Sequence, residues 1–327
     1  MDEKIEQTET TPTREDLLIR GVYDAEEFAD DLWKMREKGL EPGVSTGWHK
    51  LDEFYTVKRK QWTVVTGVPG YGKSTFLDNL LLNLAKLHGW KFLYFAFETP
   101  IDRHIAGLME IHSGKVFGKK DETKQARESF KMTDQEFNDS FQFINKHFRF
   151  VQPDEAECTV QGIMDISDEI KNTDFVFDGM VVDPWNEIEH RRPPVQTESD
   201  YISETLTKFR RFGWRQNIHF WMVAHPTKLE EVKQNFGTKA TLEQKQKIIY
   251  KKPTLYSISG SAHWRNKADM GIVIHQNQEK SNEPCEIDVQ KVRFKECGRK
   301  GQNYLYYDYF CSRMVQTVDE LLFAKFK

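Results

Sequence analysis

One segment of the sequence, from Gly67 to Thr75, has residue types and spacing that fit a defined chemistry. It matches the phosphate-binding pattern G-x-x-x-x-G-K-[ST] without a mismatch. In such a loop the glycines let backbone N–H groups surround a polyphosphate, and the start of the next helix adds its positive end. The pattern therefore predicts that a nucleoside triphosphate binds to Gly67, Val68, Pro69, Gly70, Tyr71, Gly72, Lys73, Ser74 and Thr75.

Within that loop, two side chains have separate tasks. Lys73 would reach the β- and γ-phosphates, and the Ser74 hydroxyl would bind Mg²⁺. The flanking residues support this assignment. A buried strand is predicted over residues 62–66, and apolar residues at helical spacing follow the loop as far as Gly89, where we expect the helix to end.

Three further polar residues come directly after apolar runs that read as buried strands. Asp183 ends one run and is expected to bind Mg²⁺, usually through water. Glu98 follows another, where it would orient and deprotonate the attacking water, although the same residue could simply belong to a helix N-terminus before Pro100. His225 follows a third and would hydrogen-bond the γ-phosphate, or else serve only as a structural histidine.

A late strand alternates basic residues at Lys291, Arg293 and Lys295. An arginine inserted into a neighbour's site stabilises charge on the transferred phosphoryl group and is worth about 10³–10⁵ in rate. Charges on a strand can equally protect an exposed sheet edge. The residues alone leave these two interpretations open.

Residues 226–258 hold seven lysines against three glutamates. A connection of this length is uncommon unless it is functional or disordered. Lysines suit contacts to nucleic-acid phosphates that do not depend on base sequence and that weaken in salt. An ordinary solvated loop is the alternative.

The strand-like runs alternate with helical ones, which predicts an α/β fold with a mostly parallel, twisted sheet flanked by helices. We expect strands at residues 63–66, 92–97, 148–152, 179–183, 219–224, 270–275 and 288–294, and surface helices within 119–139.

The first 41 residues are predicted to be a separate unit ahead of one domain at residues 42–327. They carry 13 acids and 6 bases, a net charge of −7, whereas the whole chain of 327 residues has −4, so the remainder is near +3. Residues 1–13 are expected to be disordered. An amphipathic helix follows, capped by Asp24 with Glu27, stapled by Tyr23 on Phe28 and ended by Gly39. Its apolar face would pack on its own domain or dock on a neighbouring subunit.

Composition excludes several other classes of protein. No apolar run approaches the ~20 residues that span a bilayer, and the acidic N-terminus does not resemble a signal peptide. Four scattered cysteines lack CxxC spacing, which disfavours a zinc site or a disulfide framework. We therefore expect a cytoplasmic protein, in the host cytoplasm if a phage encodes it, with no membrane partner.

Taken in order, these segments resemble the RecA-like motor domain of hexameric replicative DNA helicases. The likeness is to the branch of the phage primase-helicases and Twinkle, which is related to bacterial DnaB. It rests on residues 45–52, 66–75, 98–100, 182–186, 223–228, 258–264 and 291–295.

The resemblance implies a homo-oligomeric ring, usually of six subunits, with ATP or another NTP or dNTP and Mg²⁺ bound between neighbours. It assigns Glu98 as catalytic base, Asp183 and Ser74 as metal ligands, His225 as γ-phosphate sensor, and Arg293 with Lys291 as the finger given to the adjacent subunit. It places single-stranded DNA in the central channel, and residues 14–40 become the linker helix that docks on the next protomer. The DNA contacts are expected at Lys228, Lys233, Lys252, Ser259, Gly260 and Ser261.

Some features depart from the family. Many relatives carry a zinc ribbon and a primase ahead of the motor, but about 40 residues precede it here, so we expect no primer synthesis. Gln276 stands where several relatives have an arginine on the nucleotide base, which leaves the preferred nucleotide open.

The sequence thus predicts an NTP-driven replicative helicase that translocates on single-stranded DNA and unwinds forked duplex DNA, working with a separate primase, polymerase or loader. A RecA-type recombinase, or a nucleotide-gated DNA-binding ring ATPase without unwinding, is the alternative.

Overall fold

The computed structural model describes residues 13–117, 130–154, 157–227, 229–231, 250–276 and 283–321. Their contacts divide the chain into two units, Met1–Glu41 and Pro42–Lys327. Among the described residues, no helix is both long and apolar enough to cross a membrane.

The described part of the larger unit contains one sheet of nine strands in the order β3-β2-β4-β5-β1-β6-β7-β8-β9. All pairings from β3 to β6 are parallel, and those from β6 to β9 are antiparallel. The mostly parallel α/β fold is therefore confirmed. The strands are β1 (Trp62–Thr66), β2 (Phe92–Ala96), β3 (Phe148–Val151), β4 (Gly179–Asp183), β5 (His219–Val223), β6 (Met270–His275), β7 (Cys285–Val292), β8 (Gly301–Tyr307) and β9 (Met314–Val315).

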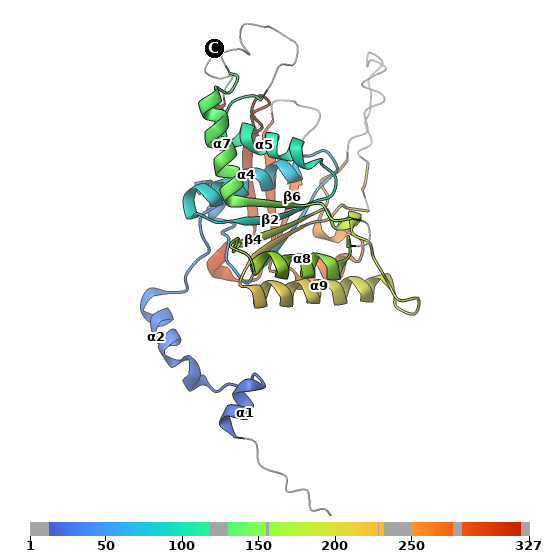
Figure 1. Ribbon diagram of the computed structural model, residues 1–327. Coiled ribbons are helices and arrows are strands. Elements are labelled where there is room, and N and C mark those ends of the chain that lie inside the picture. Colours follow the sequence, from blue (N-terminus) through green and yellow to red (C-terminus); the bar gives the residue numbers. More distant parts are fainter. Residues whose placement is uncertain are drawn as a thin grey trace, which may run out of the picture. The chain divides into compact units, whose positions relative to one another are not determined.

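Helices cover both faces of this sheet (Figure 1). On one face lie α4 (Lys73–His88), α5 (Ile101–Ser113) and α7 (Asp134–His147), and on the other lie α8 (Val160–Lys171) and α9 (Glu198–Gln216). Two apolar cores result, one on each side of the strands. The central strands β1, β2, β4 and β5 are buried along their whole length, as strands with helices on both faces must be.

The shorter described elements complete the larger unit. They are α3 (His49–Asp52), η2 (Trp185–Glu187), η3 (Leu255–Ser257), α11 (Ser261–Lys267), η4 (Lys295–Cys297) and η5 (Val318–Glu320).

The strands predicted from the sequence are all present, with ends that differ by a few residues, and β8 and β9 were missed. The helix after the phosphate loop ends at Gly89 as expected, with a left-handed φ of 68°. The predicted surface helices within 119–139 are represented by α7, while residues 118–129 lie outside the described part of the chain.

The smaller unit contains α1 (Arg14–Ile19), η1 (Ala25–Phe28) and α2 (Ala29–Lys38), and α2 ends before Gly39 as predicted. Tyr23 does contact Phe28, with ring centroids 5.5 Å apart. The capping box at Asp24 was wrong, because the Asp24 carboxylate accepts from the N–H of Glu26 and the first turn is a 3₁₀ turn. Glu27 instead pairs with Arg14 at 2.6 Å.

Thr13 was also placed wrongly in the disordered tail, since its side chain caps α1. The rest of that predicted tail, residues 1–12, lies outside the described residues.

Candidate active site

The phosphate-loop segment connects the end of β1 to the start of α4. Gly72 caps α4 with φ 85°, in the left-handed region that favours glycine. A Cβ atom at Gly67 would lie 2.3 Å from the carbonyl oxygen of Ile274 on β6, so a side chain there would force the strands apart. The backbone path between strand and helix thus depends on glycine at both ends of the loop.

Lys73 lies inside this loop and is 6% exposed. Its Nζ atom donates to the carbonyl oxygens of Gly67, at 3.0 Å, and Val68, at 3.3 Å. Burial lowers the pKa of Lys73, while the nearby carboxylates of Asp183 and Glu98 act in the opposite direction. A cation with these neighbours is suited to bind a phosphate that enters the loop.

The carboxyl ends of adjacent strands bring the other predicted residues beside the loop. Asp183 is the last residue of β4, whereas Glu98 and His225 lie two residues beyond the ends of β2 and β5. Because β4 and β5 lie between β2 and β1, all three residues share one edge of the sheet with the loop. His225 Nε2 is 3.8 Å from Glu98 Oε1.

A hollow of about 340 Å³ separates these side chains from the loop. Every residue of its lining is one that the sequence predicted to bind the nucleotide or to act on it. The lining residues are Pro69, Gly70, Gly72, Lys73, Ser74, Thr75, Glu98 and His225.

Asp183 is 7% exposed and lies where a metal ligand is expected. Its Oδ2 atom accepts a hydrogen bond from the Tyr94 hydroxyl at 2.9 Å. Burial raises the pKa of Asp183, and hydrogen bonds from Ser74 and Tyr94 oppose that rise.

The donor set at this point fits a hard cation, because Ser74 and Asp183 offer adjacent oxygen atoms. Among the described residues no group of three or more His, Cys, Asp or Glu side chains could hold a metal by itself. An ion here would need further oxygen ligands from phosphate or water, as Mg²⁺ commonly does.

Sequence reasoning missed a polar network that borders Ser74 and Asp183. Tyr94, Asp78 and His104 line a second hollow of about 240 Å³, together with Ser74 and Asp183. His104 Nε2 lies 2.9 Å from Asp78 Oδ1. Burial pushes the pKa of His104 down, but the charge and hydrogen bond of Asp78 outweigh it and raise the pKa.

Two signals in the sequence would have found part of this network. Asp78 stands four residues after Ser74, and that spacing puts both on one face of a helix. Tyr94 lies inside an apolar strand, where a buried hydroxyl needs a partner.

His225 is positioned through its backbone, since its N–H donates to Asn186 Oδ1 at 2.9 Å. Burial lowers the pKa of His225, and the positive charge of Lys73 lowers it further. A neutral imidazole therefore faces the loop at neutral pH.

Arg293 and Lys291 lie at the opposite edge of the sheet from the phosphate loop. The Arg293 N–H donates to Asp269 O at 2.9 Å, and the Asp269 N–H donates to Trp62 O at 3.2 Å, so Arg293 is beside the first residue of β1. The phosphate loop begins after Thr66, the last residue of β1. The two ends of β1 are roughly 13 Å apart at about 3.3 Å per residue.

The residues expected to contact DNA are only partly described. Lys228 and Lys233 lie outside the described residues. Lys252 pairs with Glu286 at 2.8 Å and Asp288 at 2.9 Å, so both carboxylates of β7 engage its ammonium.

Near the predicted DNA-facing turn, the Ser259 hydroxyl donates to Glu198. Gly260 caps α11 in the left-handed region with φ 62°, and Ser261 is the first residue of that helix. The turn is thus fixed to the start of α9 on one side and to α11 on the other.

Comparison with known proteins agrees with this arrangement, although no protein-family model matches the chain. The Twinkle homolog protein, chloroplastic/mitochondrial, of Arabidopsis thaliana is 35% identical over 300 residues, which cover 89% of this chain. The match spans 39% of that relative's length.

Two solved structures share the fold. One is an ATPase domain solved by itself, which matches with a TM-score of 0.67 and 16% identity, over 90% of this chain and 99% of that one. The other is a DnaB-like replicative helicase, solved in a study of its interactions with primase, which matches with a TM-score of 0.66 and 16% identity, over 92% and 70%. With a phosphate loop and three strand-end polar residues on one edge of a RecA-like sheet, the larger unit is a RecA-fold helicase domain of the DnaB-like type.

Proposed function

We propose that this protein is an NTP-driven replicative DNA helicase that works as a ring, with each nucleotide held between two subunits. The observation that carries the proposal is the separation of Lys73 and Arg293 onto opposite edges of one sheet. Since Arg293 lies beside the start of β1, its side chain serves a triphosphate only if that triphosphate is bound to another copy of the chain. A closed ring of such head-to-tail contacts supplies every site with one lysine and one arginine.

Within one subunit the residues divide the work as follows. Lys73 and the backbone N–H groups of the loop bind the phosphates, and Glu98 takes a proton from the attacking water. A Mg²⁺ ion held by Ser74 and Asp183 would neutralise charge on the β- and γ-phosphates. His225, held neutral, donates or accepts one hydrogen bond at the γ-phosphate.

The connection that follows His225 gives hydrolysis a route to DNA. Pro226 bridges to Ile258, and the Thr227 N–H donates to Ser257 O at 2.8 Å. The two ends of the lysine-rich segment are thus joined next to the residue that senses the γ-phosphate. We propose that Lys228, Lys233, Lys252 and the turn Ser259, Gly260 and Ser261 contact the DNA backbone in the ring channel. A DNA phosphate would there compete with the carboxylates that now pair with Lys252.

Assembly and partners belong to the same proposal. The helix α2 of the smaller unit is proposed to dock on the next subunit of a six-membered ring, and the relative solved with primase suggests that a separate primase is a partner.

The test is unwinding of a forked DNA duplex with NTP and Mg²⁺ by the full chain and by Lys73→Ala and Arg293→Ala proteins. Both substitutions should abolish unwinding, and mixing the two proteins should restore part of it, because mixed rings contain sites with both residues. Lys86→Ala, on the same helix as Lys73, and Arg299→Ala, an exposed arginine paired with Glu53, are the matched controls and should stay active.

Other outcomes identify other functions. DNA-stimulated hydrolysis with strand exchange and no unwinding would point to a recombinase. Nucleotide-dependent DNA binding without hydrolysis would point to a nucleotide-gated binding protein, and full activity of Arg293→Ala protein would refute the role given to the arginine.

A further inference from the structure

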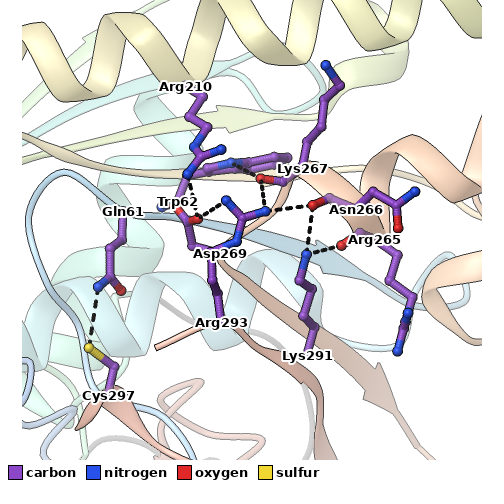
Figure 2. Close-up of polar contacts among 10 residues, drawn as sticks. All are labelled: Gln61, Trp62, Arg210, Arg265, Asn266, Lys267, Asp269, Lys291, Arg293 and Cys297. Atoms are coloured by element: carbon purple, nitrogen blue, oxygen red, sulfur yellow. Dashed lines mark hydrogen bonds and ion pairs between the residues drawn. The ribbon is translucent and has the colours of Figure 1, made fainter. Parts of the chain in front are cut away.

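A buried carboxylate lies behind the proposed arginine finger. Asp269 stands between α11 and β6, and its side chain is 1% exposed. Its Oδ1 atom is 3.1 Å from Arg293 Nη1 and 3.5 Å from Arg210 Nη2, and its Oδ2 atom accepts the N–H of Trp62 at 3.2 Å. Figure 2 shows the arginines from α9 and from the end of β7 converging on this one carboxylate.

The main chain of Asp269 fixes the same neighbours a second time. Its carbonyl oxygen accepts the N–H of Arg293 at 2.9 Å, and its own N–H donates to the carbonyl of Trp62 at 3.2 Å. Asp269 therefore ties both the backbone and the guanidinium of Arg293 to the start of β1, a strand buried along its whole length.

The end of α11 holds the remaining donors of the basic pair. Arg293 Nη2 donates to the carbonyl of Asn266 at 2.6 Å, and Lys291 Nζ donates to the same carbonyl at 3.0 Å and to that of Arg265. These contacts lie side by side in Figure 2. The Arg293 side chain remains 26% exposed, so its contacts are made on the inner side while part of the guanidinium faces outward.

Carbonyl groups alone would hold an arginine loosely, because they bear only partial charges. A carboxylate forms stronger, charge-assisted hydrogen bonds that also restrict the plane of the guanidinium. Removing that charge would leave two arginines facing each other across a buried site, where like charges repel. The charge of Asp269 is therefore required both to place Arg293 and to keep Arg210 beside it.

We infer that Asp269 is a positioning residue for catalysis in trans, which orients Arg293 toward the nucleotide of the neighbouring subunit with support from Arg210. The inference rests on the proposed function, because it requires that Arg293 acts on a neighbour's site. Asp269 itself touches no substrate in this scheme.

The test is Asp269→Asn, which keeps the size of the side chain and one oxygen acceptor for the Trp62 N–H. DNA-stimulated hydrolysis should fall by about 10²-fold, the loss expected when a catalytic group is misplaced by about 1 Å. Affinity for a fluorescent nucleotide should stay within about twofold of the parent, since the phosphate loop lies at the other edge of the sheet.

Mixing experiments separate positioning from a general structural defect. Lys73→Ala protein supplies a sound finger, so mixing should restore hydrolysis to Asp269→Asn subunits. Arg293→Ala protein supplies none, so mixing with it should restore nothing. Rescue by both proteins, or by neither while Lys73→Ala and Arg293→Ala still complement each other, would overturn the inference.

The controls keep the inference apart from the proposed function. Asp178→Asn is matched, because Asp178 also accepts a backbone N–H, from Lys91, and pairs with an arginine, Arg59, away from Arg293. It should hydrolyse NTP at the parental rate.

If Asp269→Asn protein does not fold, Arg210→Gln removes the second arginine of the cluster and should show a smaller loss with the same rescue pattern. Parental hydrolysis by Arg210→Gln protein would then count against the inference. Failure of Lys73→Ala and Arg293→Ala to complement would instead refute the proposed function itself.

Discussion

The Tyr94 hydroxyl donates a hydrogen bond of 2.9 Å to Asp183, so the carboxylate at the end of β4 is held by a residue of the neighbouring strand β2. Tyr94 is 1% exposed, and the negative charge of Asp183 raises the pKa of its hydroxyl further above the range that burial alone sets. The hydroxyl therefore stays protonated and always donates. With Oδ2 engaged in this way, Oδ1 is the Asp183 oxygen better placed to serve a metal or its water.

Replacing Tyr94 with Phe should raise the Mg²⁺ concentration that gives half-maximal NTP hydrolysis. The substitution leaves a buried carboxylate without its donor, and a hydrogen bond to a charged group contributes about 1.5–3 kcal/mol to stability. Titration of hydrolysis with Mg²⁺, alongside urea unfolding, measures both effects.

Tyr55→Phe is the matched control for that change. Tyr55 is also fully buried and its hydroxyl has two partners, Thr63 at 3.0 Å and Trp221 at 2.9 Å, but neither borders the metal ligands. It should lower stability and leave the Mg²⁺ requirement unchanged. An equal shift in both proteins would mean that Tyr94 has no special role.

Replacing Glu98 with Gln should stop hydrolysis while nucleotide still binds. The Glu98 side chain is 49% exposed at the loop and 3.8 Å from His225, so the fold does not depend on its charge. Loss of a general base costs about 10²–10⁴ in rate. Single-turnover hydrolysis and fluorescent-nucleotide binding would be measured together.

Glu110→Gln is the control for Glu98. Glu110 lies on α5 and accepts the N–H of Phe117 at 2.8 Å, outside the residues that line either hollow. It should hydrolyse NTP normally. If Glu98→Gln protein also hydrolysed NTP at the parental rate, another group would have to be the base.

The residues that sequence reasoning placed well are those fixed by strand ends. Each of Glu98, Asp183 and His225 follows an apolar run, and parallel strands bring such ends to one edge whatever the details of packing. The contact between Asp269 and Arg293 could not be predicted in this way. It depends on how β7 pairs with β6, and that register shifts at a bulge between Gly271 and Ile272.

The missed strand β8 shows a second limit. Its residues alternate between exposed and buried, with Gln302 and Tyr304 outward and Asn303 and Leu305 inward. The period of two is present, but a buried asparagine obscures it, because only the fold reveals which polar residue faces the core. The capping box at Asp24 failed for a related reason, since Glu27 had a competing partner in Arg14.

Replacing Leu32 with Glu in α2 should reduce the mass of the assembled protein. Leu32 is 52% exposed, and Phe28 and Met35 on the same predicted face are exposed as well. Burying a leucine contributes about 1.5–3 kcal/mol, which a charge there would forfeit at every subunit contact. Light scattering after size exclusion measures the mass.

Lys34→Glu reverses a charge on the same helix without touching the apolar residues, since Lys34 is exposed and pairs with Asp31. Its assembly should match that of the parent. Unchanged mass in Leu32→Glu protein would argue that α2 does not dock on a neighbour.

Acid should destabilise the domain through His219, a fully buried residue of β5. Its ring nitrogens lie 2.8 Å from Lys58 O and 2.9 Å from Thr63 Oγ1. Burial lowers its pKa from 6.5 to about 4, and the hydrogen bond to the Lys58 carbonyl only partly offsets this.

The sign of the effect follows from which state binds the proton. Below pH 6.5 the unfolded chain takes up a proton at His219 that the folded domain refuses until about pH 4. The stabilisation is therefore complete above pH 6.5 and is lost as the pH falls toward 4, by about 3 kcal/mol at 1.36 kcal/mol per pKa unit.

Urea unfolding of the parent and of His219→Gln protein at several pH values between 8 and 4 isolates this contribution. Glutamine can still donate to the Lys58 carbonyl but takes up no proton, so the variant should lose less stability as the pH falls. The stability gap between the two proteins at pH 8 should narrow by pH 4. Parallel curves would show that His219 does not carry the acid sensitivity, and the other buried histidine with a pKa near 4, His112, would then be the residue to replace.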